Sequence, residues 1–466
     1  MNRTHLATAT ATATGLLLAT LVGTAANATT GANNSATTST TRAADAAAPE
    51  GPGLHLNWSA FGTIGAAVSD RPWGYQRHIR NSVRFERDSV LGMQADIAFS
   101  PQWSATVQGR VAPQANDDGR WALTASWAFV AWRPDNDWLL RAGKLRVPFF
   151  LRSEQLEVGQ TYDEARLPGE VYTLAPTNDL VGLHVSRSWA QPQGDWTLEA
   201  YVGNSDMYKR AWVRDPVPSP VPGQPPLLPA GSRFTEADVS VVGAVLTWRT
   251  PELTARAGVH HARTHLTSGR AIISQPAWVP LGPGIGYWQT DPSQPGPGPV
   301  LAPRIRNELY TLGADWRLGG GWRVAGELIR VQQHDTQLGV QGWSGYGTLY
   351  RSWGNVTPYL TAAVARSDQR PVDWQQRLDS TTVPAMAPGA AVLNAMMRTQ
   401  ADAMPVMRQQ SLALGSSYAL TPTSKLKLEW LHTRAGPSAL VDVPAGQSLG
   451  QRRTVNVLSA SYSFVY

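Results

Sequence analysis

The sequence predicts an all-β fold, a sixteen-stranded antiparallel transmembrane β-barrel over residues 54–466, with short turns at one end and long loops at the other. Three observations predict this fold. Apolar residues recur at every second position in successive segments of the chain. Short and long connections alternate between these segments, and the chain ends on an aromatic residue, Tyr466, that continues the last of them. A period of two indicates strands with two unlike faces, and the asymmetry of the connections is typical of a membrane barrel.

Composition narrows the classes of protein that fit this chain. It has 466 residues, a formal net charge of +6 and 16% charged residues, and it shows no basic block of the kind that binds nucleic acid. No nucleic-acid partner is therefore expected. There is no cysteine, which excludes disulfides and thiolate chemistry. Glycine and tryptophan are abundant, and both suit a protein of tight turns and membrane interfaces.

The N-terminal region predicts export. Residues 1–28 have a short basic start, the apolar stretch GLLLATLVG and the small-residue sequence ANA, which are the parts of a secretory signal peptide. An Ala/Thr-rich tail is the alternative interpretation. Residues 29–53 read as a flexible leader. Farther along, the uncharged stretch 380–397 contains Pro384, Pro388 and Gly389, so it does not qualify as a membrane helix.

The alternating segments and their connections are consistent with a strand meander. We expect the first strand at 54–68, and clear alternation also marks 91–99, 103–109, 121–129, 196–202, 412–418, 426–430 and 458–466. Tight turns are expected at 100–102, 134–137, 191–195, 250–252, 319–321, 353–355 and 421–424. The other connections, most of them long, are expected at 70–87, 113–120, 146–177, 205–235, 265–303, 335–338, 368–408 and 436–451.

The physical chemistry of a bilayer explains this pattern. Every backbone N–H and C=O group in hydrocarbon must be paired, so a sheet that crosses the membrane must close on itself. One face then meets lipid and the other meets a wet lumen. Tryptophans beside the predicted turns suit the headgroup level, and they are Trp103, Trp121, Trp138, Trp196, Trp248, Trp316, Trp322 and Trp353. A soluble β-sandwich, in which these rings would be core, is the alternative fold.

The C-terminal sequence LSASYSFVY carries a family resemblance. Tyr462, Phe464 and Tyr466 stand at alternate positions, and the chain resembles Gram-negative outer-membrane porins, whose C-termini look similar. The resemblance implies that these three residues serve as the signal for the barrel-assembly machinery. It also implies periplasmic turns, extracellular loops, a location in the outer membrane of a Gram-negative bacterium and assembly as a homotrimer.

The third long connection resembles the loop that follows strand five in sixteen-stranded porins, particularly putative porins related to the phosphate-selective O and P group. The resemblance implies that it folds into the barrel and narrows the pore. The expected constriction residues are Arg146, Arg152, Glu154, Glu157, Asp163, Glu164, Arg166 and Glu170.

Further charged residues are expected on the pore wall, because side chains at alternate positions of a strand point to the same face. They are Asp96, Arg110, Arg141, Glu199, Arg256, Glu327, Lys427 and Glu429. Opposed charges would create a transverse field; surface ion pairs on an ordinary loop are the alternative.

Two local motifs do not point to chemistry. The sequence GQSLG at 446–450 matches a nucleophile elbow, but it lies in a predicted loop, so an outer-membrane lipase is only a remote alternative. His260, His261 and His265 are spread along a predicted strand, too far apart for one ion, so no metal site is expected. No cofactor motif is present. The chain is therefore predicted not to be an enzyme.

The sequence thus predicts a porin, a water-filled channel for passive diffusion of small hydrophilic solutes and ions. Its first partner is the lipid of the outer membrane. The alternative is a substrate-specific channel, for phosphate or other anions, or for aromatic or sugar ligands. Acidic residues interleaved with the arginines of the third loop weigh against strict anion selectivity. A plugged, purely structural barrel remains a further alternative.

Overall fold

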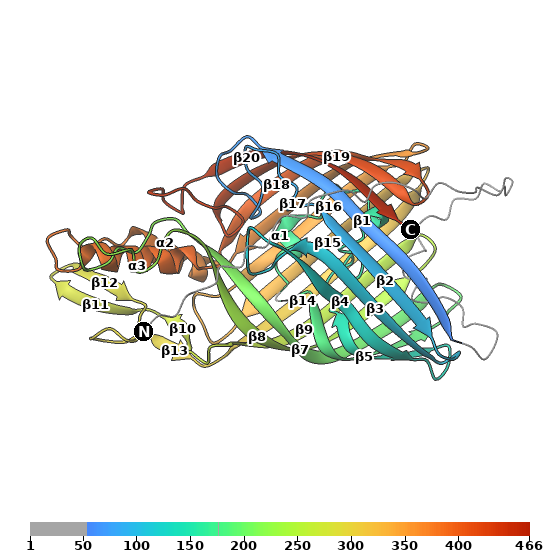
Figure 1. Ribbon diagram of the computed structural model, residues 1–466, viewed down its shortest axis with the longest axis horizontal. Coiled ribbons are helices and arrows are strands. Elements are labelled where there is room, and N and C mark those ends of the chain that lie inside the picture. The colour runs from blue at the N-terminus through green and yellow to red at the C-terminus, as the bar shows by residue number, and fades with distance from the viewer. Residues whose placement is uncertain (1–53, 176) are drawn as a thin grey trace, which may run out of the picture.

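The computed structural model describes residues 54–175 and 177–466, and the signal peptide and leader predicted at 1–53 lie outside them. Sixteen strands form one closed antiparallel barrel, which confirms the predicted fold (Figure 1). Around the wall they are β1 His55–Ser69, β2 Val90–Ala98, β3 Trp103–Pro113, β4 Trp121–Trp132, β5 Trp138–Arg146, β6 Asp179–Trp189, β7 Asp195–Val213, β8 Gly231–Arg249, β9 Leu253–Leu266, β14 Ile305–Gly319, β15 Trp322–Gln333, β16 Gln341–Arg351, β17 Val356–Ser367, β18 Met407–Thr421, β19 Ser424–Ser438 and β20 Arg453–Val465.

The barrel closes where its first strand meets its last. β1 pairs with β20 from Phe61 opposite Val465 to Ser69 opposite Val457. Beyond that ladder, the backbone N–H of Ala60 donates to the Tyr466 carbonyl at 3.0 Å, and the N–H of Tyr466 donates to the Ala60 carbonyl at 2.8 Å. The final residue of the chain therefore completes the seam, as the aromatic C-terminal strand predicted.

The two faces of the wall differ as expected for a strand with lipid on one side. Leu91 and Met93 on β2 are exposed outward, whereas Gln94 and Gln108 are buried inside and joined by a hydrogen bond of 2.8 Å. Trp103 and Trp132 stack on the outer face beside a tight turn, with ring centroids 5.8 Å apart. The apolar outer face and its aromatic rim are the features that a spanning barrel needs.

One strand departs from the predicted parity. The sequence places Trp121, Trp127 and Phe129 on the same face of β4, but a bulge at Ser126 shifts the register against β3. Trp121 is exposed outward, whereas Phe129 is buried in an interior cluster and Trp127 packs against it. The one-face assignment is therefore wrong beyond Ser126, because one extra residue reverses every later side chain.

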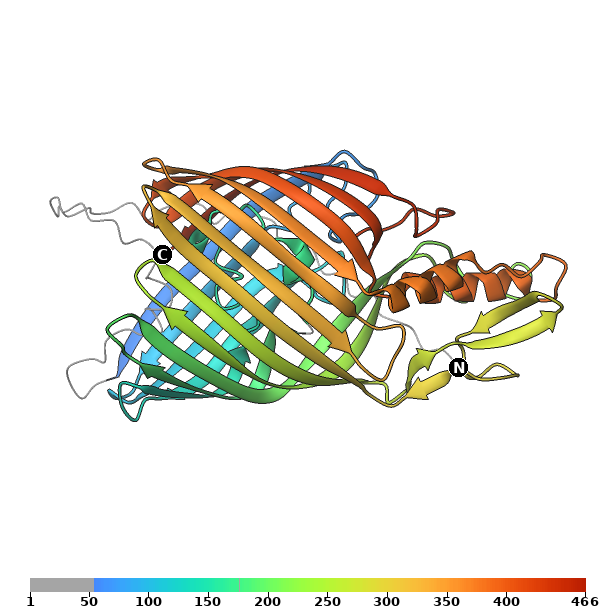
Figure 2. The same ribbon diagram turned by 180° about the vertical axis from the view of Figure 1, so that it is seen from behind.

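The tight turns lie where the sequence predicts them, but three of the outer long connections contain regular structure. Much of 205–235 belongs to β7 and β8, which extend as a hairpin beyond the other strands. The connection 265–303 folds into two small sheets, made of β10 Ile272–Gln275 with β13 Val300–Ala302 and of β11 Ala277–Gly282 with β12 Ile285–Gln289. The connection 368–408 contains α2 Gln369–Ser380 and α3 Ala390–Asp402. These elements project from the loop end of the barrel (Figure 2).

The two outer helices form a small core of their own. Leu378 of α2 and Met397 of α3 are fully buried in one cluster with Trp374. Between them, the Asn394 side chain bonds both the N–H of Val383, at 2.8 Å, and its carbonyl, at 3.0 Å. In the part of the chain that the structure describes, neither these helices nor any other is long and apolar enough to cross a membrane.

We predict that deleting Tyr466, or replacing Phe464 and Tyr466 with serine, reduces the assembled barrel at least about tenfold, because an open seam leaves backbone groups unpaired in hydrocarbon. Heat-modifiable migration of the membrane fraction measures assembly. Tyr418→Ser is the matched control, since Tyr418 is exposed outward on β18, away from the seam. Normal assembly of the seam variants would contradict the prediction.

Candidate functional site

The third long loop, described at residues 147–175, 177 and 178, lies inside the barrel and contacts its wall on several sides. It begins with Val147, Phe149 and Phe150, which are buried, and continues through the short elements η1 Gly159–Thr161 and α1 Gly169–Tyr172. Figure 1 shows α1 enclosed by the strands. The N–H of Leu151 donates to Glu327 of β15 at 2.8 Å. The predicted inward course of this loop agrees with these contacts.

Glu157 anchors the loop to one side of the wall. Its carboxylate accepts hydrogen bonds from Arg146 at 2.7 Å, from the Ser126 hydroxyl at 3.0 Å and from Arg110 on β3. The Glu157 side chain is 7% exposed. Burial raises the pKa of Glu157, but Arg146 and Arg110 outweigh burial and hold the pKa below its usual range. The bulge at Ser126 thus turns a hydroxyl toward this carboxylate.

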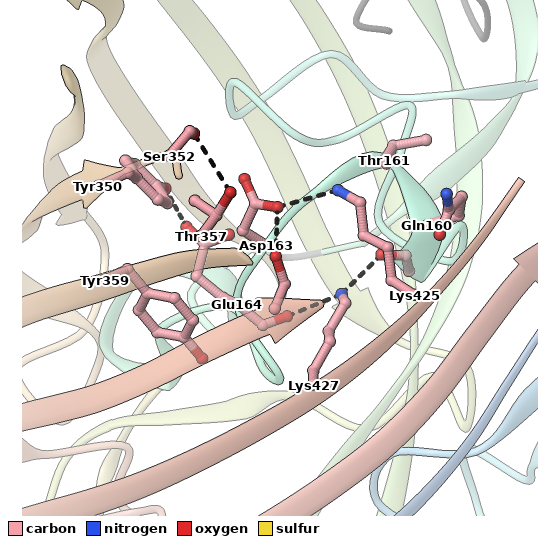
Figure 3. Close-up of polar contacts among 12 residues, drawn as sticks. Gln160, Thr161, Asp163, Glu164, Tyr350, Ser352, Thr357, Tyr359, Lys425 and Lys427 are labelled. Carbon is pink, nitrogen blue, oxygen red and sulfur yellow. Dashed lines mark hydrogen bonds and ion pairs between the residues drawn. The ribbon is translucent and has the colours of Figure 1, made fainter. Parts of the chain in front are cut away.

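Asp163 anchors the loop to the opposite side. It accepts from Lys425 at 2.9 Å, as Figure 3 shows. It also accepts from the Ser417 hydroxyl at 2.8 Å, and Arg323 lies 3.3 Å away. Burial raises the pKa of Asp163, but Lys425 and Arg323 outweigh it and lower the pKa to about 2. The carboxylate therefore stays ionised near neutral pH and joins strands β15, β18 and β19 through one loop residue.

Arg152 and Arg323 share a second carboxylate, Asp315 of β14. Arg152 donates to it at 2.8 Å and Arg323 at 2.7 Å. Arg323 also lies over the Tyr350 ring, with its guanidinium carbon 4.4 Å from the centroid. Three basic and two acidic side chains, counting Lys425 and Asp163, form this network. Each charge has an opposite neighbour, which offsets the cost of placing it away from bulk water.

Lys427 binds the loop backbone instead of a carboxylate. Its ammonium donates to the carbonyl of Gly159 at 2.6 Å and to that of Glu164 at 2.9 Å, as Figure 3 shows. The ammonium also lies 4.0 Å from the centroid of the Tyr162 ring. The Glu164 side chain accepts from the hydroxyl of Tyr350. A buried cation solvated by carbonyls and a ring fixes the turn of the loop at this point.

The other buried acids of the site have neutral partners. Glu327 accepts from the hydroxyls of Tyr172, at 2.5 Å, and Tyr346, at 2.9 Å. Glu429 accepts from Tyr359 at 2.8 Å. Glu170 of the loop accepts from the Gln409 amide at 2.8 Å. The bonds of Tyr172 and Glu170 tie the C-terminal part of the loop to β15 and β18, whereas the Tyr359–Glu429 bond joins β17 to β19.

Arg166 connects the inserted loop to the first outer loop. It donates to both oxygens of Asp88, through Nε at 2.7 Å, and to the Ser459 hydroxyl at 3.0 Å. Burial lowers the pKa of Arg166, but Asp88 outweighs burial, so that the net effect raises it. The guanidinium therefore stays charged and joins residues that are 78 positions apart in the sequence.

The other residues predicted for the pore wall make polar contacts with neighbouring strands or with the inserted loop, and their role in a pore stays a prediction. Asp96 accepts from Thr106 at 2.7 Å. Arg141 lies 3.6 Å from Glu154 of the loop. Arg256 lies 3.4 Å from Glu199 and donates to the Pro148 carbonyl at 2.9 Å.

The charged side chains of the loop thus lie in the lumen, but they are paired with other residues, whereas the sequence predicts that they face permeating ions. The expectation is of opposed charges that face permeating ions. In the structure Arg146, Arg152 and Arg166 are each buried in an ion pair that fastens the loop. Sequence reasoning missed their partners Asp88 and Asp315, and also missed Arg323 and Lys425. Strand parity gives Arg323 and Lys425 an inward direction, but pairing with a loop residue more than 150 positions away leaves no local signal.

A cavity of about 1660 Å³ lies between the inserted loop and the outer loops. Its lining includes Tyr162 and Arg166 of the loop, His260 of the wall, and Asp291 and Met404 of the outer loops. Its walls therefore come from both the site and the loops above it. The lining mixes polar, apolar and both kinds of charged side chain, so it can hold water and solutes of varied character.

His260 and the GQSLG sequence, which are not expected to carry chemistry, make hydrogen bonds within the fold. His260 bonds the Tyr201 hydroxyl at 2.6 Å, and within residues 54–175 and 177–466 no three metal-ligating side chains gather into a possible metal site. Ser448 of the GQSLG sequence lies in a loop and donates to Asp379 at 3.0 Å, and His432, the nearest histidine in sequence, bonds Asn456 at 2.8 Å.

No protein-family model matches the chain, and no curated protein does. Solved structures of similar fold include OmpT lacking loop L8, an outer membrane protein of Vibrio cholerae, with 7% identity, a TM-score of 0.49 and coverage of 89% of this chain and 99% of that one. The outer membrane channel DcaP of Acinetobacter baumannii shows 12% identity, a TM-score of 0.48 and coverage of 89% and 98%. An anion-selective porin from Comamonas acidovorans shows 10% identity, a TM-score of 0.46 and coverage of 89% and 100%. At these identities and scores the likeness adds nothing about function.

We predict that Glu157→Gln lowers the free energy of opening the loop by about 3 kcal/mol, because it leaves the buried Arg146 and the partly exposed Arg110 without a carboxylate. Hydrogen exchange of residues 155–166 should rise while the strands stay protected. Glu86→Gln is the matched control, since Glu86 pairs at 3.6 Å with an arginine that is 44% exposed. Equal exchange in both variants would show that Glu157 is not an anchor.

Acid should loosen the same loop through Asp163. A carboxylate whose pKa is lowered by folding contributes stability above its unfolded pKa, and loses it as the pH falls through the folded value. With a folded pKa of about 2, the loss falls between about pH 4 and pH 2 and amounts to about 2 kcal/mol. Exchange of the loop, corrected for intrinsic rates, should therefore rise over this range. In Asp163→Asn the loop should already be loose at pH 4; an unchanged pH response in this variant would exclude Asp163.

Proposed function

We propose that the chain is a porin, a water-filled channel for passive diffusion of small hydrophilic solutes across the outer membrane of a Gram-negative bacterium. The observation that carries the proposal is the closed barrel with a cavity of about 1660 Å³ above a loop folded into its lumen. Such a channel needs no catalytic group, only a passage that the loop narrows. We also propose the signal peptide, the homotrimer and the assembly signal at Tyr462, Phe464 and Tyr466 on the family resemblance alone.

The charge distribution supports a weakly selective channel. The carboxylates of Glu157 and Asp163 are each held by two cations, so neither sign of charge forms an unpaired ring across the loop. A strictly phosphate-selective channel would need cations without acids among them. A constriction whose carboxylates and cations neutralise each other selects solutes by size more than by charge.

A plugged barrel is the second candidate, and a specific observation favours it. The loop is fastened to β3, β14, β15 and β19 by charged side chains that are mostly buried. A segment tied on so many sides does not swing aside easily. Conductance of the parent protein separates the two candidates.

We predict that the purified protein gives stepwise conductance in planar bilayers, and that deleting residues 155–166 enlarges the step at least about twofold. The deletion removes three acids, Glu157, Asp163 and Glu164, and one arginine, Arg166. It leaves Arg110, Arg146 and Lys425 in place. The reversal potential in a salt gradient should therefore move toward anion selectivity. The shift should fade at 1 M salt, where the Debye length is about 3 Å.

Deleting residues 221–227 from the outer β7–β8 connection is a control of similar kind, since this segment lies outside the lumen contacts described above. It should leave step size and reversal potential unchanged. Steps that appear only after deletion of 155–166 would indicate the plugged barrel. Steps that are identical in parent and variant would show that the loop does not set the narrowest point.

A further inference from the structure

Arginines gather on the outward face of the wall, at the loop end of β15–β18. Arg330, Trp343, Arg366 and Arg408 are register partners on four successive strands. Arg366 is exposed outward, and Arg434 on β19 is exposed on the same face, opposite Gln410. We call Arg330, Arg366, Arg408 and Arg434 the outer arginine row. It lies on the outside of the barrel and contributes nothing to the lumen described above.

The row is short of carboxylates. Arg330 is paired with Asp368 through two bonds of 2.7 Å. Arg408 donates to the Gln369 side-chain oxygen at 2.7 Å, and Arg366 lies 5.9 Å from the Trp343 ring centroid. Among the described residues, no carboxylate forms an ion pair with Arg366, Arg408 or Arg434.

The register places like charges against each other. Arg366 and Arg408 are direct partners, so their Cβ atoms are about 5 Å apart. Like charges directly opposite each other destabilise a sheet, and among residues 54–175 and 177–466 no carboxylate forms an ion pair with either arginine. Two adjacent arginines that no carboxylate of the described residues neutralises can be stabilised by an anion that binds from outside the protein. Phosphate is such an anion, because guanidinium groups bind phosphate oxygens in pairs.

The depth of the row points to a lipid as the source of the phosphate. From Arg366 along β17 into the wall, the outward residues are Val364, Ala362 and Leu360, and on β18 Leu412 and Leu414 follow Gln410. The row therefore stands at the edge of the apolar band. Trp343, beside Arg366, is exposed outward at the same level, as rings at the headgroup level are. A phosphate at this height belongs to a lipid headgroup.

We propose that the outer arginine row binds the phosphate groups of a phosphorylated glycolipid of the lipid A type in the leaflet on the loop side. The choice of leaflet rests on the proposed outer-membrane location, in which the long loops face outward. The acyl chains lie against the leucines of β17 and β18, while the headgroup phosphates meet Arg366, Arg408 and Arg434. Arg330, already neutralised by Asp368, borders the site.

Native mass spectrometry of the detergent-solubilised protein tests the proposal. The probes are bisphosphorylated lipid A, the same lipid without its phosphates, phosphatidylglycerol and inorganic phosphate. We expect the parent to bind bisphosphorylated lipid A at least about tenfold more tightly than the dephosphorylated form. R366A/R408A should lose that preference, and adding R434A should weaken binding further. Inorganic phosphate should compete only at far higher concentration.

R187A/R351A is the matched control, because it also removes two arginines. Arg187 lies 5.1 Å from the ring centroids of Trp138 and Trp189, and Arg351 lies 4.9 Å from that of Trp322, all beside the tight turns. This variant should keep the lipid A preference. The like-charge pair also gives R366A/R408A a distinct signature: it should be at least as heat-stable as the parent without lipid, but gain no stability when lipid A is added.

Equal binding of the two forms of lipid A, or of phosphatidylglycerol and lipid A, would overturn the proposal. So would dissociation of an oligomer by R366A/R408A with lipid binding intact, since the row would then be a contact between protein copies. Conductance reports on the channel separately. A protein that binds lipid A but does not conduct would contradict the proposed channel and leave this site standing.

Discussion

The backbone of a sheet in hydrocarbon must find every hydrogen-bond partner within the sheet, and the rest of this structure depends on that constraint. It explains why sixteen strands close on themselves and why the last residue takes part in the seam. Closure also separates two environments along every strand. The outward residues can then be apolar without forming a core, and the inward residues can be polar because the lumen and the inserted loop satisfy them.

Inside the barrel, ion pairs hold the inserted loop in place, whereas the outer face of the wall is stabilised by contact with lipid. The inserted loop brings charged side chains into a confined space, where its Arg152 and Arg166, and Arg146 at the end of β5, each pair with a carboxylate. Breaking one such pair would leave a buried charge alone, which costs far more than an exposed pair ever contributes. The ion pairs that fix the loop also neutralise the charges that take part in them. The anchoring of the loop and the weak charge selectivity that we propose therefore rest on the same ion pairs.

The sequence allowed the wall to be predicted because its signals are local. Alternation at residues such as Leu91 and Met93, and turn residues such as those at 319–321, need no knowledge of distant contacts. The bulge at Ser126 has no glycine or proline to mark it, so parity failed beyond it. Asp163 and Lys425 are 262 positions apart, and nothing near either residue indicates their pairing. One face of the outer part of the β7–β8 hairpin packs through Arg210 and Trp212 against other loops, so the apolar alternation that reveals a spanning strand is absent there.

That hairpin has a consequence for how the protein meets its surroundings. Arg210 of β7 bonds Asp442, from the loop before the last strand, at 2.8 Å, and Asp118 of the second loop at 3.1 Å. Arg214 bonds Asp379 of α2 and lies 2.7 Å from Asp402 of α3. Segments from most of the chain therefore form one outer surface, and that surface is complete only once β20 has brought the final loop into place. An antibody or a bacteriophage that binds this outer surface would recognise a discontinuous epitope, made of residues from several loops. It would distinguish finished barrels from unfinished ones without touching the membrane.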